Sequence, residues 1–281
     1  MGHSGTTLFP DGVALYKARA KPGRVCGPAS LDYDGIERNF SMAVAISVVV
    51  PVKDEADNIA PLAREIAAAL VGLGESEIIF VDDGSSDGTA GALKALKSEL
   101  ATLRIISHAE NTGQSRAIRT GVRAARGEIV VTLDGDGQND PADIPKLLAA
   151  LQRGEASLGL VSGVRAKRMD TTSRRLASRA ANAIRQGLLH DGAADAGCGL
   201  KAFKREAFLA LPYFDHLHRF LITMMIREGY KVEFVPVNHR PRLHGQSKYT
   251  NFNRMMVGIA DLMGVRWLQR RMRKLSGAKE L

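Results

Sequence analysis

Apolar, β-branched runs alternate with helical patterns of leucine and isoleucine through the first half of the chain. Such runs occupy residues 45–52, 77–81, 103–107 and 128–133. After the first run, apolar residues recur at helical spacing from Ile59 to Leu73. Fully apolar runs are typical of strands buried on both faces. The alternation predicts a β-α-β-α-β-α-β order and therefore an α/β fold, a doubly wound, mostly parallel sheet with helices on both faces.

The turn after the first strand carries helix-start signals. Asp57 or Asn58 is expected to cap the first helix, with Pro61 in its first turn, and Gly74 is expected to end it. In the second half of the chain, the pattern predicts strands at 158–163 and 232–237 and helices at 172–189 and 217–227. It also predicts a loop with a short strand at 195–203 and a cationic loop at 239–249.

The two ends of the chain differ from the middle. Residues 1–41 mix Gly, Pro, Lys, Arg and Asp without periodicity, so we expect them to be disordered or not native, with Met42 as a candidate start. Residues 42–250 then form the main domain, and 251–281 a basic, amphipathic helix and tail. This helix suits the surface of an anionic membrane. Packing on the main domain or on a separate membrane subunit is an equally good reading.

Composition narrows the classes of partner. The chain has 281 residues, 45% of them hydrophobic, and 39 Lys and Arg against 30 Asp and Glu, giving +9. A basic balance favours nucleic acid, anionic membranes or phosphorylated substrates. Aromatic residues are only 5%, which argues against stacking on single-stranded bases. The two cysteines form no framework, so a reducing compartment is expected. No apolar run reaches the 18 residues of a membrane span.

The most informative stretch is the acidic loop at 134–140. Asp134 and Asp136 follow a predicted strand, with Gly135 and Gly137 beside them. Two carboxylates at this spacing suit Mg²⁺ or Mn²⁺, completed by substrate phosphates and water. A calcium loop of the EF-hand type is excluded, because its sixth and twelfth positions would be Asn139 and Pro145. A plain polar loop capping the next helix is the structural alternative, and Asp140, before a proline, fits that role better.

Other strand ends collect acids early in the chain and bases late. Glu55, Asp83 and Asp134 are expected to meet at one edge of the sheet, where they can accept hydrogen bonds from a nucleotide or hold a metal. The cations that could neutralise phosphates are Arg165, Lys201, Arg242 and Lys248. Several neighbours have simpler readings. Asp87 is expected to cap a helix, Asp82 to brace its loop, and Cys198 to be a packed side chain.

These motifs resemble the family 2 glycosyltransferases of the GT-A fold, from about residue 46 to 249. The resemblance rests on Val-Pro-Val-Lys-Asp-Glu at 50–55, Val-Asp-Asp-Gly-Ser-Ser-Asp-Gly-Thr at 81–89 and Asp-Gly-Asp-Gly-Gln at 134–138. The segments 199–203, 218–220 and 242–249 are similar to the polyprenyl-phosphate branch, to which dolichyl-phosphate mannose synthase and undecaprenyl-phosphate sugar transferases belong. Many relatives carry two C-terminal transmembrane helices, and this chain departs from them there.

The resemblance implies roles by position. The residues implied to bind the nucleotide-sugar are Pro51, Val52, Glu55, Asp83, Asp134 and Lys201, and those implied to bind Mg²⁺ or Mn²⁺ are Asp134, Asp136 and Gln138. The residues implied to bind phosphate of the donor or the lipid are Arg165, Arg242, Ser247 and Lys248. The residues implied to take part in catalysis are Asp136, Arg165, His218 and Arg219.

The resemblance further implies transfer of a sugar from a GDP- or UDP-sugar to a polyprenyl phosphate, with inversion, on the inner face of the cytoplasmic membrane and without nucleic acid. A lipid monophosphate is anionic near neutral pH, because its second pKa is about 6. No dedicated base is then required. A family 2 enzyme acting on a saccharide or lipid hydroxyl is the alternative, with Asp195 as its candidate base. An inactive lipid-binding relative is another, disfavoured by the intact acids and cations.

Overall fold

The computed structural model describes residues 14–15, 45–165, 183–193, 195–241 and 251–272, without the side chains of 14–15 and 251–257. Within these residues the strands are β1 (Ala14–Leu15), β2 (Ile46–Val52), β3 (Ser76–Asp82), β4 (Leu103–Ser107), β5 (Ile129–Thr132), β6 (Leu158–Arg165), β7 (Lys201–Lys204) and β8 (Lys231–Val237). The helices are α1 (Ala56–Leu70), α2 (Thr89–Leu96), α3 (Gln114–Ala124), the 3₁₀ turn η1 (Pro141–Asp143), α4 (Ile144–Arg153), α6 (Arg205–Leu209), α7 (Leu217–Arg227) and α8 (Asn251–Arg271). Residues 183–189 are also helical, and the rest of the helix predicted at 172–189 lies outside the described residues.

The described strands form one sheet, in the order β1-β8-β6-β7-β5-β2-β3-β4. Strands β2, β3, β4 and β5 pair in parallel, as do β6 and β8. The exceptions are β7, antiparallel to both β5 and β6, and β1, antiparallel to β8. The predicted mostly parallel α/β sheet is therefore confirmed. The reversed strand β7 in its middle is a feature that the hydrophobic pattern did not specify.

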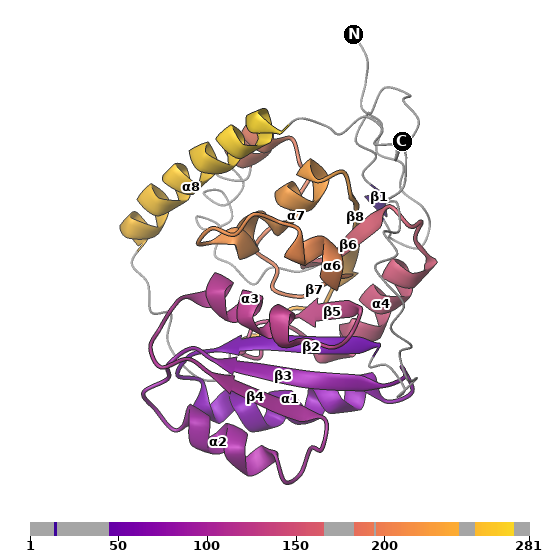
Figure 1. Ribbon diagram of the computed structural model, residues 1–281, viewed down its shortest axis with the longest axis vertical. Helices are drawn as coiled ribbons and strands as arrows, with labels where there is room; N and C mark the ends of the chain where they lie inside the picture. Colours follow the sequence, from indigo (N-terminus) through magenta and orange to yellow (C-terminus); the bar gives the residue numbers. More distant parts are fainter. Residues whose placement is uncertain (1–13, 16–44, 166–182, 194, 242–250, 273–281) are drawn as a thin grey trace, which may run out of the picture.

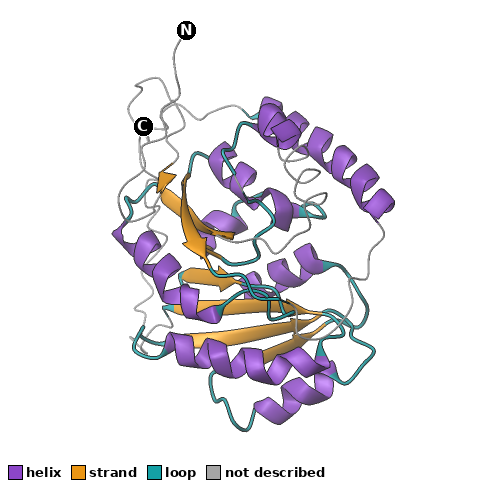
Figure 2. Ribbon diagram, turned by 180° about the vertical axis from the view of Figure 1, so that it is seen from behind, coloured by secondary structure: helices purple, strands orange, loops and turns teal. Residues whose placement is uncertain are grey.

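Helices cover both faces of the sheet (Figures 1 and 2). Helices α1, α2 and α4 bury Ile59, Leu93 and Leu147 against one face. Helices α3, α6 and α7 bury residues such as Val122 and Phe208 against the other. The predicted doubly wound arrangement is thus present, because a sheet of apolar strands exposes two faces that both need a cover.

Helix boundaries differ from the sequence expectation at α1. The helix begins at Ala56 with Glu55 as its N-cap residue, so Asn58 lies inside the first turn and not at the cap. It ends at Leu70, four residues before Gly74. The backbone carbonyl of Glu55 accepts a hydrogen bond from the N–H of Asn58 at 2.9 Å. Asp140 is the expected cap, since its carboxylate accepts from the N–H of Ala142 at 3.0 Å.

Helix α8 lies outside α7, at the far end of the molecule from α2 (Figure 1). Its inner side is anchored by Val265, which is 1% exposed, and by an ion pair of 2.9 Å between Asp261 and His216. Ile259, Met263 and Trp267 are 51%, 60% and 57% exposed. Their spacing of four residues places them on one face of the helix. The helix thus packs on the main domain and still presents an apolar stripe outwards.

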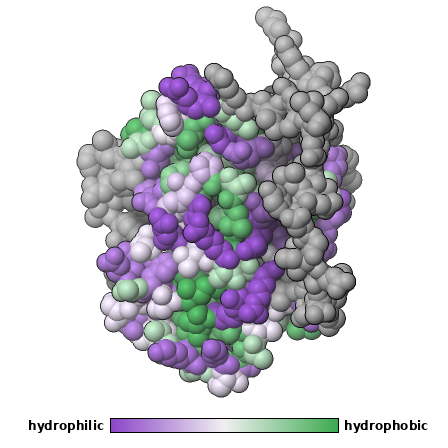
Figure 3. Space-filling view, in the orientation of Figure 1, coloured by the Kyte–Doolittle hydropathy of each residue, from purple (hydrophilic) through white to green (hydrophobic). Residues whose placement is uncertain are grey.

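Much of the surface mixes polar and apolar side chains. On the face drawn in Figure 3, hydrophobic residues form separate patches down the middle of the molecule, with hydrophilic residues around them. No helix in the described part of the chain is long and apolar enough to cross a membrane. At the other end of the chain, the two residues of β1 pair with Phe234 and Glu233. The other residues of 1–41 lie outside the described ranges, so their expected disorder stays a prediction.

Candidate active site

The acidic loop leaves the carboxyl end of β5, next to the end of β2. Gly135 packs so closely on β2 that a Cβ would lie 2.5 Å from Cγ1 of Val52. Gly137 has a φ of +73°, a backbone conformation that favours glycine. Both glycines are therefore required by the path of the loop, which turns Asp134 and Asp136 away from the strand at the edge where open α/β sheets bind ligands.

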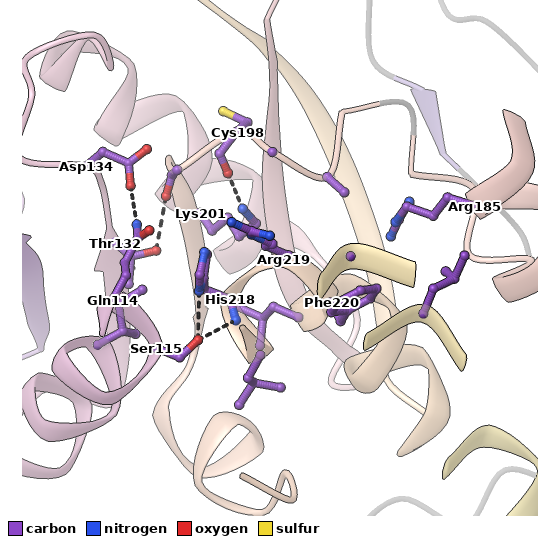
Figure 4. Close-up of a pocket in the computed structure, with 18 of the residues that line it drawn as sticks. Gln114, Ser115, Thr132, Asp134, Arg185, Cys198, Lys201, His218, Arg219 and Phe220 are labelled. Carbon is purple, nitrogen blue, oxygen red and sulfur yellow. Dashed lines mark hydrogen bonds between the residues drawn. The ribbon is translucent and has the colours of Figure 1, made fainter. Parts of the chain in front are cut away.

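The carboxylate of Asp134 is held from two sides. Its Oδ1 accepts a hydrogen bond from the side-chain amide of Gln114 at 2.7 Å (Figure 4). On the other side lies the backbone of Gly199, where a Cβ would overlap Oδ2 of Asp134 and come within 2.8 Å of Oδ1 of Asn139. That Asn139 oxygen accepts from the N–H of Asp134 at 3.0 Å. The carboxylate therefore has one defined orientation at the pocket.

Electrostatics make this site receptive to a cation. Burial, and after it the charge of Asp136, raise the pKa of Asp134 to about 6. A divalent cation would relieve this repulsion, so the two carboxylates fit Mg²⁺ or Mn²⁺. Among the described residues no group of three His, Cys, Asp or Glu side chains could hold the ion alone. This agrees with a metal completed by substrate phosphates. The expected ligand role of the Gln138 side chain stays a prediction.

The predicted nucleoside side lies at the ends of β2 and β3. Pro51 and Val52 are buried there, and the carbonyl of Val52 accepts from the N–H of Asp83 at 2.9 Å. The carboxylate of Asp83 accepts from the N–H groups of Thr112 (2.9 Å) and Gly113 (2.8 Å). It also lies 2.8 Å from Nδ1 of His108. Burial works to raise the pKa of Asp83, but these hydrogen bonds hold it below its usual value.

Asp83 therefore braces the loop before α3 as well as standing at the predicted nucleoside site. Asp82 has the bracing role expected for it, since its Oδ1 accepts from the N–H of Ser85 at 3.0 Å. Asp87 accepts from the N–H of Thr89 at 2.9 Å, at the start of α2, as expected of a capping side chain. The carboxylate of Glu55 accepts from the side-chain amide of Asn58 at 2.6 Å. Whether Glu55 also contacts a nucleotide stays a prediction.

Two of the predicted cations lie inside the site. Arg165, at the end of β6, forms two hydrogen bonds of 2.7 Å to the carboxylate of Asp195. Lys201 is 5% exposed, donates to the carbonyl of Cys198, and has its pKa lowered by burial. Cys198 is a packed side chain, as expected, and burial raises the pKa of its thiol. The bidentate pair leaves Asp195 poorly placed to act as a base, because Arg165 occupies both of its carboxylate oxygens.

A cavity of about 910 Å³ joins these residues to α7 and α8. Its polar end includes Gln114, Asp134, Lys201, His218 and Arg219. Its other end is mainly apolar and is lined by Ile184, Phe208, Leu217, Phe220, Leu221, Ile259 and Leu262, together with Arg185, whose guanidinium is paired with Asp191. Figure 4 shows Asp134 at one side, with His218 and Arg219 between it and Phe220. The cavity therefore offers charge at one end and hydrocarbon contact at the other.

The other residues predicted to bind phosphate lie later in the chain. Arg242, Ser247 and Lys248 fall outside the described residues, so their phosphate-binding role stays a prediction. Just before them, the guanidinium of Arg240 lies 2.6 Å from Asp140 and 2.6 Å from Glu65. These contacts tie the end of the segment after β8 to the acidic loop.

Gln114 and Ser115 are pocket residues that the sequence reasoning missed. They form the first turn of α3, directly after Gly113, whose φ is +90°. Asn111-Thr-Gly-Gln-Ser follows a predicted strand end, as the acidic loop does. Their position after a strand end was the sequence feature that could have identified them. Amide and hydroxyl side chains are, however, less specific indicators of a binding site than charged ones.

The sheet and the acidic loop define a GT-A glycosyltransferase fold. A solved structure of glucosyl-3-phosphoglycerate synthase from Mycobacterium tuberculosis, with Mn²⁺, UDP-glucose and phosphoglyceric acid, superposes with a TM-score of 0.63. It is 19% identical, and the match covers 84% of this chain and 82% of that one. Residues 47–211 match Glycosyl transferase family 2, and the chain belongs to that family.

Curated relatives are more similar in sequence. The dodecaprenyl-phosphate galacturonate synthase of Rhizobium johnstonii is 34% identical over 233 residues, covering 81% of this chain and 68% of the relative. The undecaprenyl-phosphate 4-deoxy-4-formamido-L-arabinose transferase of an Enterobacter species is 35% identical over 220 residues, covering 78% and 66%. The chain thus spans about two thirds of the length of these relatives.

Proposed function

We propose that this glycosyltransferase moves a sugar from a GDP- or UDP-sugar to a polyprenyl phosphate, with inversion and with Mg²⁺ or Mn²⁺. The observation that carries the proposal is the cavity with Asp134 and Lys201 at one end and Phe220 and Leu262 at the other. A lipid phosphate has the same division between charged head and apolar chain. The names of the relatives, which specify dodecaprenyl and undecaprenyl phosphate, support the same acceptor.

Each part of the site has a role in this reaction. Asp134 and Asp136 hold the divalent ion, which when bound supplies positive charge to the leaving diphosphate. Pro51, Val52, Glu55 and Asp83 line the nucleoside side. Arg165, Lys201 and Arg219, with Arg242, Ser247 and Lys248, supply cations and donors for phosphate oxygens. Such fixed charges stabilise the transition state more than the ground state.

A phosphate acceptor does not require a dedicated base. A phosphate monoester oxygen is anionic near neutral pH and can attack the anomeric carbon. The new carbon–oxygen bond forms as the bond to the nucleoside diphosphate breaks, and the leaving group departs with the electron pair. A hydroxyl acceptor would instead need a carboxylate to take its proton. The engagement of Asp195 by Arg165 weighs against that alternative.

A polyprenyl acceptor also implies a place of action. The stripe of Ile259, Met263 and Trp267 on α8 borders the cavity through Ile259, and Arg266, Arg270 and Arg271 lie on the same helix. Apolar residues with arginines suit the headgroup region of an anionic bilayer. We therefore place the protein peripherally at the cytoplasmic face of the membrane, bound to lipid directly or through a membrane subunit.

The test is a transfer assay with purified protein, undecaprenyl phosphate in mixed micelles, Mg²⁺ or Mn²⁺, and a panel of labelled UDP- and GDP-sugars. The expected product is a lipid-soluble sugar phosphate whose anomeric configuration is inverted. Asp136→Asn and excess chelator should each remove most of the transfer. Lipid-independent transfer to a saccharide, or full turnover with chelator present, would overturn the acceptor or the metal respectively.

A further inference from the structure

Ser115 connects the first turn of α3 to the first turn of α7. Its hydroxyl oxygen accepts a hydrogen bond from the backbone N–H of His218 at 3.2 Å. The same oxygen lies 2.7 Å from Nδ1 of the His218 ring. Both contacts appear in Figure 4, where the imidazole stands between Ser115 and Lys201. Residues 103 positions apart in the chain are thereby held in one arrangement.

This geometry favours one position for the proton of the ring. A serine hydroxyl has a single proton, and its oxygen already accepts from a backbone N–H. Among the described residues, Nδ1 is the acceptor within reach of that proton. When the hydroxyl donates to Nδ1, both groups have a partner and the proton of the neutral imidazole resides on Nε2; in the other tautomer Nδ1–H would donate to the second lone pair of the serine oxygen. Burial, followed by the charges of Arg219 and Lys201, lowers the pKa of His218 to about 3, which agrees with a neutral ring.

The other ring nitrogen, Nε2, is part of a residue that lines the cavity. His218 lines its polar end together with Lys201 and Arg219, two cations that attract an anion. A neutral imidazole with its proton on Nε2 can donate a hydrogen bond there, but it cannot take a proton at that atom. A base acting on an acceptor hydroxyl would need the opposite tautomer or a different residue.

We propose that Ser115 is a positioning residue that holds His218 as a neutral Nε2–H donor to a phosphate oxygen in the cavity. This assignment rests on the proposed function for the identity of the ligand, but the tautomer does not. The phosphate belongs either to the nucleoside diphosphate or to the prenyl phosphate. The fixed donor would bind the anion without adding another full charge next to Lys201 and Arg219.

The tautomer is measured by ¹H–¹⁵N NMR of histidine-labelled full-length protein at pH 7, with His218 assigned by its loss in His218→Gln. The expected spectrum has a protonated Nε2 and an unprotonated Nδ1. An Nδ1–H tautomer or an imidazolium would overturn the proposal. This readout needs no turnover, so it stands apart from the transfer assay.

Titration then identifies the phosphate. UDP or GDP with Mg²⁺ forms one arm, and geranyl phosphate alone forms the other. A shift of the Nε2 proton in the first arm assigns the donor diphosphate, and a shift in the second assigns the acceptor. Failure of both ligands to move the His218 resonances, while they bind elsewhere on the protein, would overturn the contact.

Variants test the positioning role. Ser115→Ala should produce a mixture of tautomers and lower kcat by about tenfold, the size of one net hydrogen bond. Ser115→Thr keeps the hydroxyl and should restore the tautomer. Ser98→Ala is the matched control, because Ser98 is exposed just after α2 and its hydroxyl donates to the local carbonyl of Ala95 at 2.9 Å. Wild-type tautomer and kcat in folded Ser115→Ala would overturn the role of Ser115.

Discussion

Among single residues, Gly199 has no room for a side chain, because a Cβ there would overlap Oδ2 of Asp134. A methyl group there would displace the carboxylate of Asp134 from its place beside Gln114. Displacement of a reacting group by about 1 Å can cost about 100-fold in rate. Gly199→Ala should therefore lower kcat by about 100-fold in the transfer assay while the protein remains folded.

Gly91→Ala provides the control for this substitution. Gly91 lies in α2 with open space around it, so alanine there should raise the free energy of unfolding by about 0.5–1 kcal/mol and leave kcat unchanged. Equal activities of Gly199→Ala and wild type would show that the Asp134 carboxylate does not need its present position.

His218 gives a second prediction at this scale, about stability and pH. Its pKa is about 3 in the folded protein and about 6.5 when unfolded, so the unfolded chain binds the extra proton as pH falls below 6.5. Folding free energy is then lost by up to about 1.4 kcal/mol per pH unit. Urea unfolding between pH 6.5 and 5 should show a shallower pH slope for His218→Gln than for wild type. Equal slopes would contradict a buried, neutral ring.

Among the elements, α8 is the one that we propose contacts the membrane. Met263 is 60% exposed on the apolar stripe, and inserting such a side chain in lipid contributes about 1.5–3 kcal/mol. Met263→Glu should therefore weaken binding to anionic phospholipid vesicles by about tenfold or more in a sedimentation assay. Val71→Glu is the control, because Val71 is 80% exposed at the end of α1. Similar losses of vesicle binding in Met263→Glu and Val71→Glu would show that α8 does not form the membrane contact.

The order of elements was predictable, whereas their direction and side-chain partners were not. Buried strands such as β2 and β3 are recognisable in the sequence as continuous apolar runs. The two aspartates of the acidic loop come directly after such a run. The four residues of β7 carry no comparable pattern, because Lys201 and Lys204 are at its ends. Its reversal nevertheless places Lys201 opposite Thr132, at the ligand edge.

Site residues were predictable where charge or a motif marked them. Asp134, His218 and Arg219 line the same cavity, while the roles that the resemblance implies for them stay predictions. The pairing of Arg165 with Asp195 could not be foreseen, since it joins residues 30 positions apart in the chain. The contacts of Gln114 and Ser115 also depend on tertiary structure, since each reaches a residue on a different element.

For the whole molecule, the main question is which part of the chain is needed to fold. From 1–41, only Ala14 and Leu15 are described, and each forms one pair with β8. Deleting 1–41 should therefore lower the free energy of unfolding by no more than about 1 kcal/mol, equal to a few degrees in Tm. Calorimetry and the transfer assay on the shortened chain provide the check. Loss of the cooperative transition would show that the segment belongs to the fold.

The reversed strand β7 also sets the sequence of events during synthesis. Strand β5 has β2 on one side and β7 on the other, and Ile129 of β5 pairs with Lys204 of β7. A nascent chain that has emerged only as far as β5 can assemble β2 to β5, but one apolar strand edge then has no neighbour until about 70 more residues leave the ribosome. Unpaired edges promote aggregation. Translation pauses between β5 and β7, or shortage of a chaperone, should therefore reduce the soluble yield more than pauses after β7.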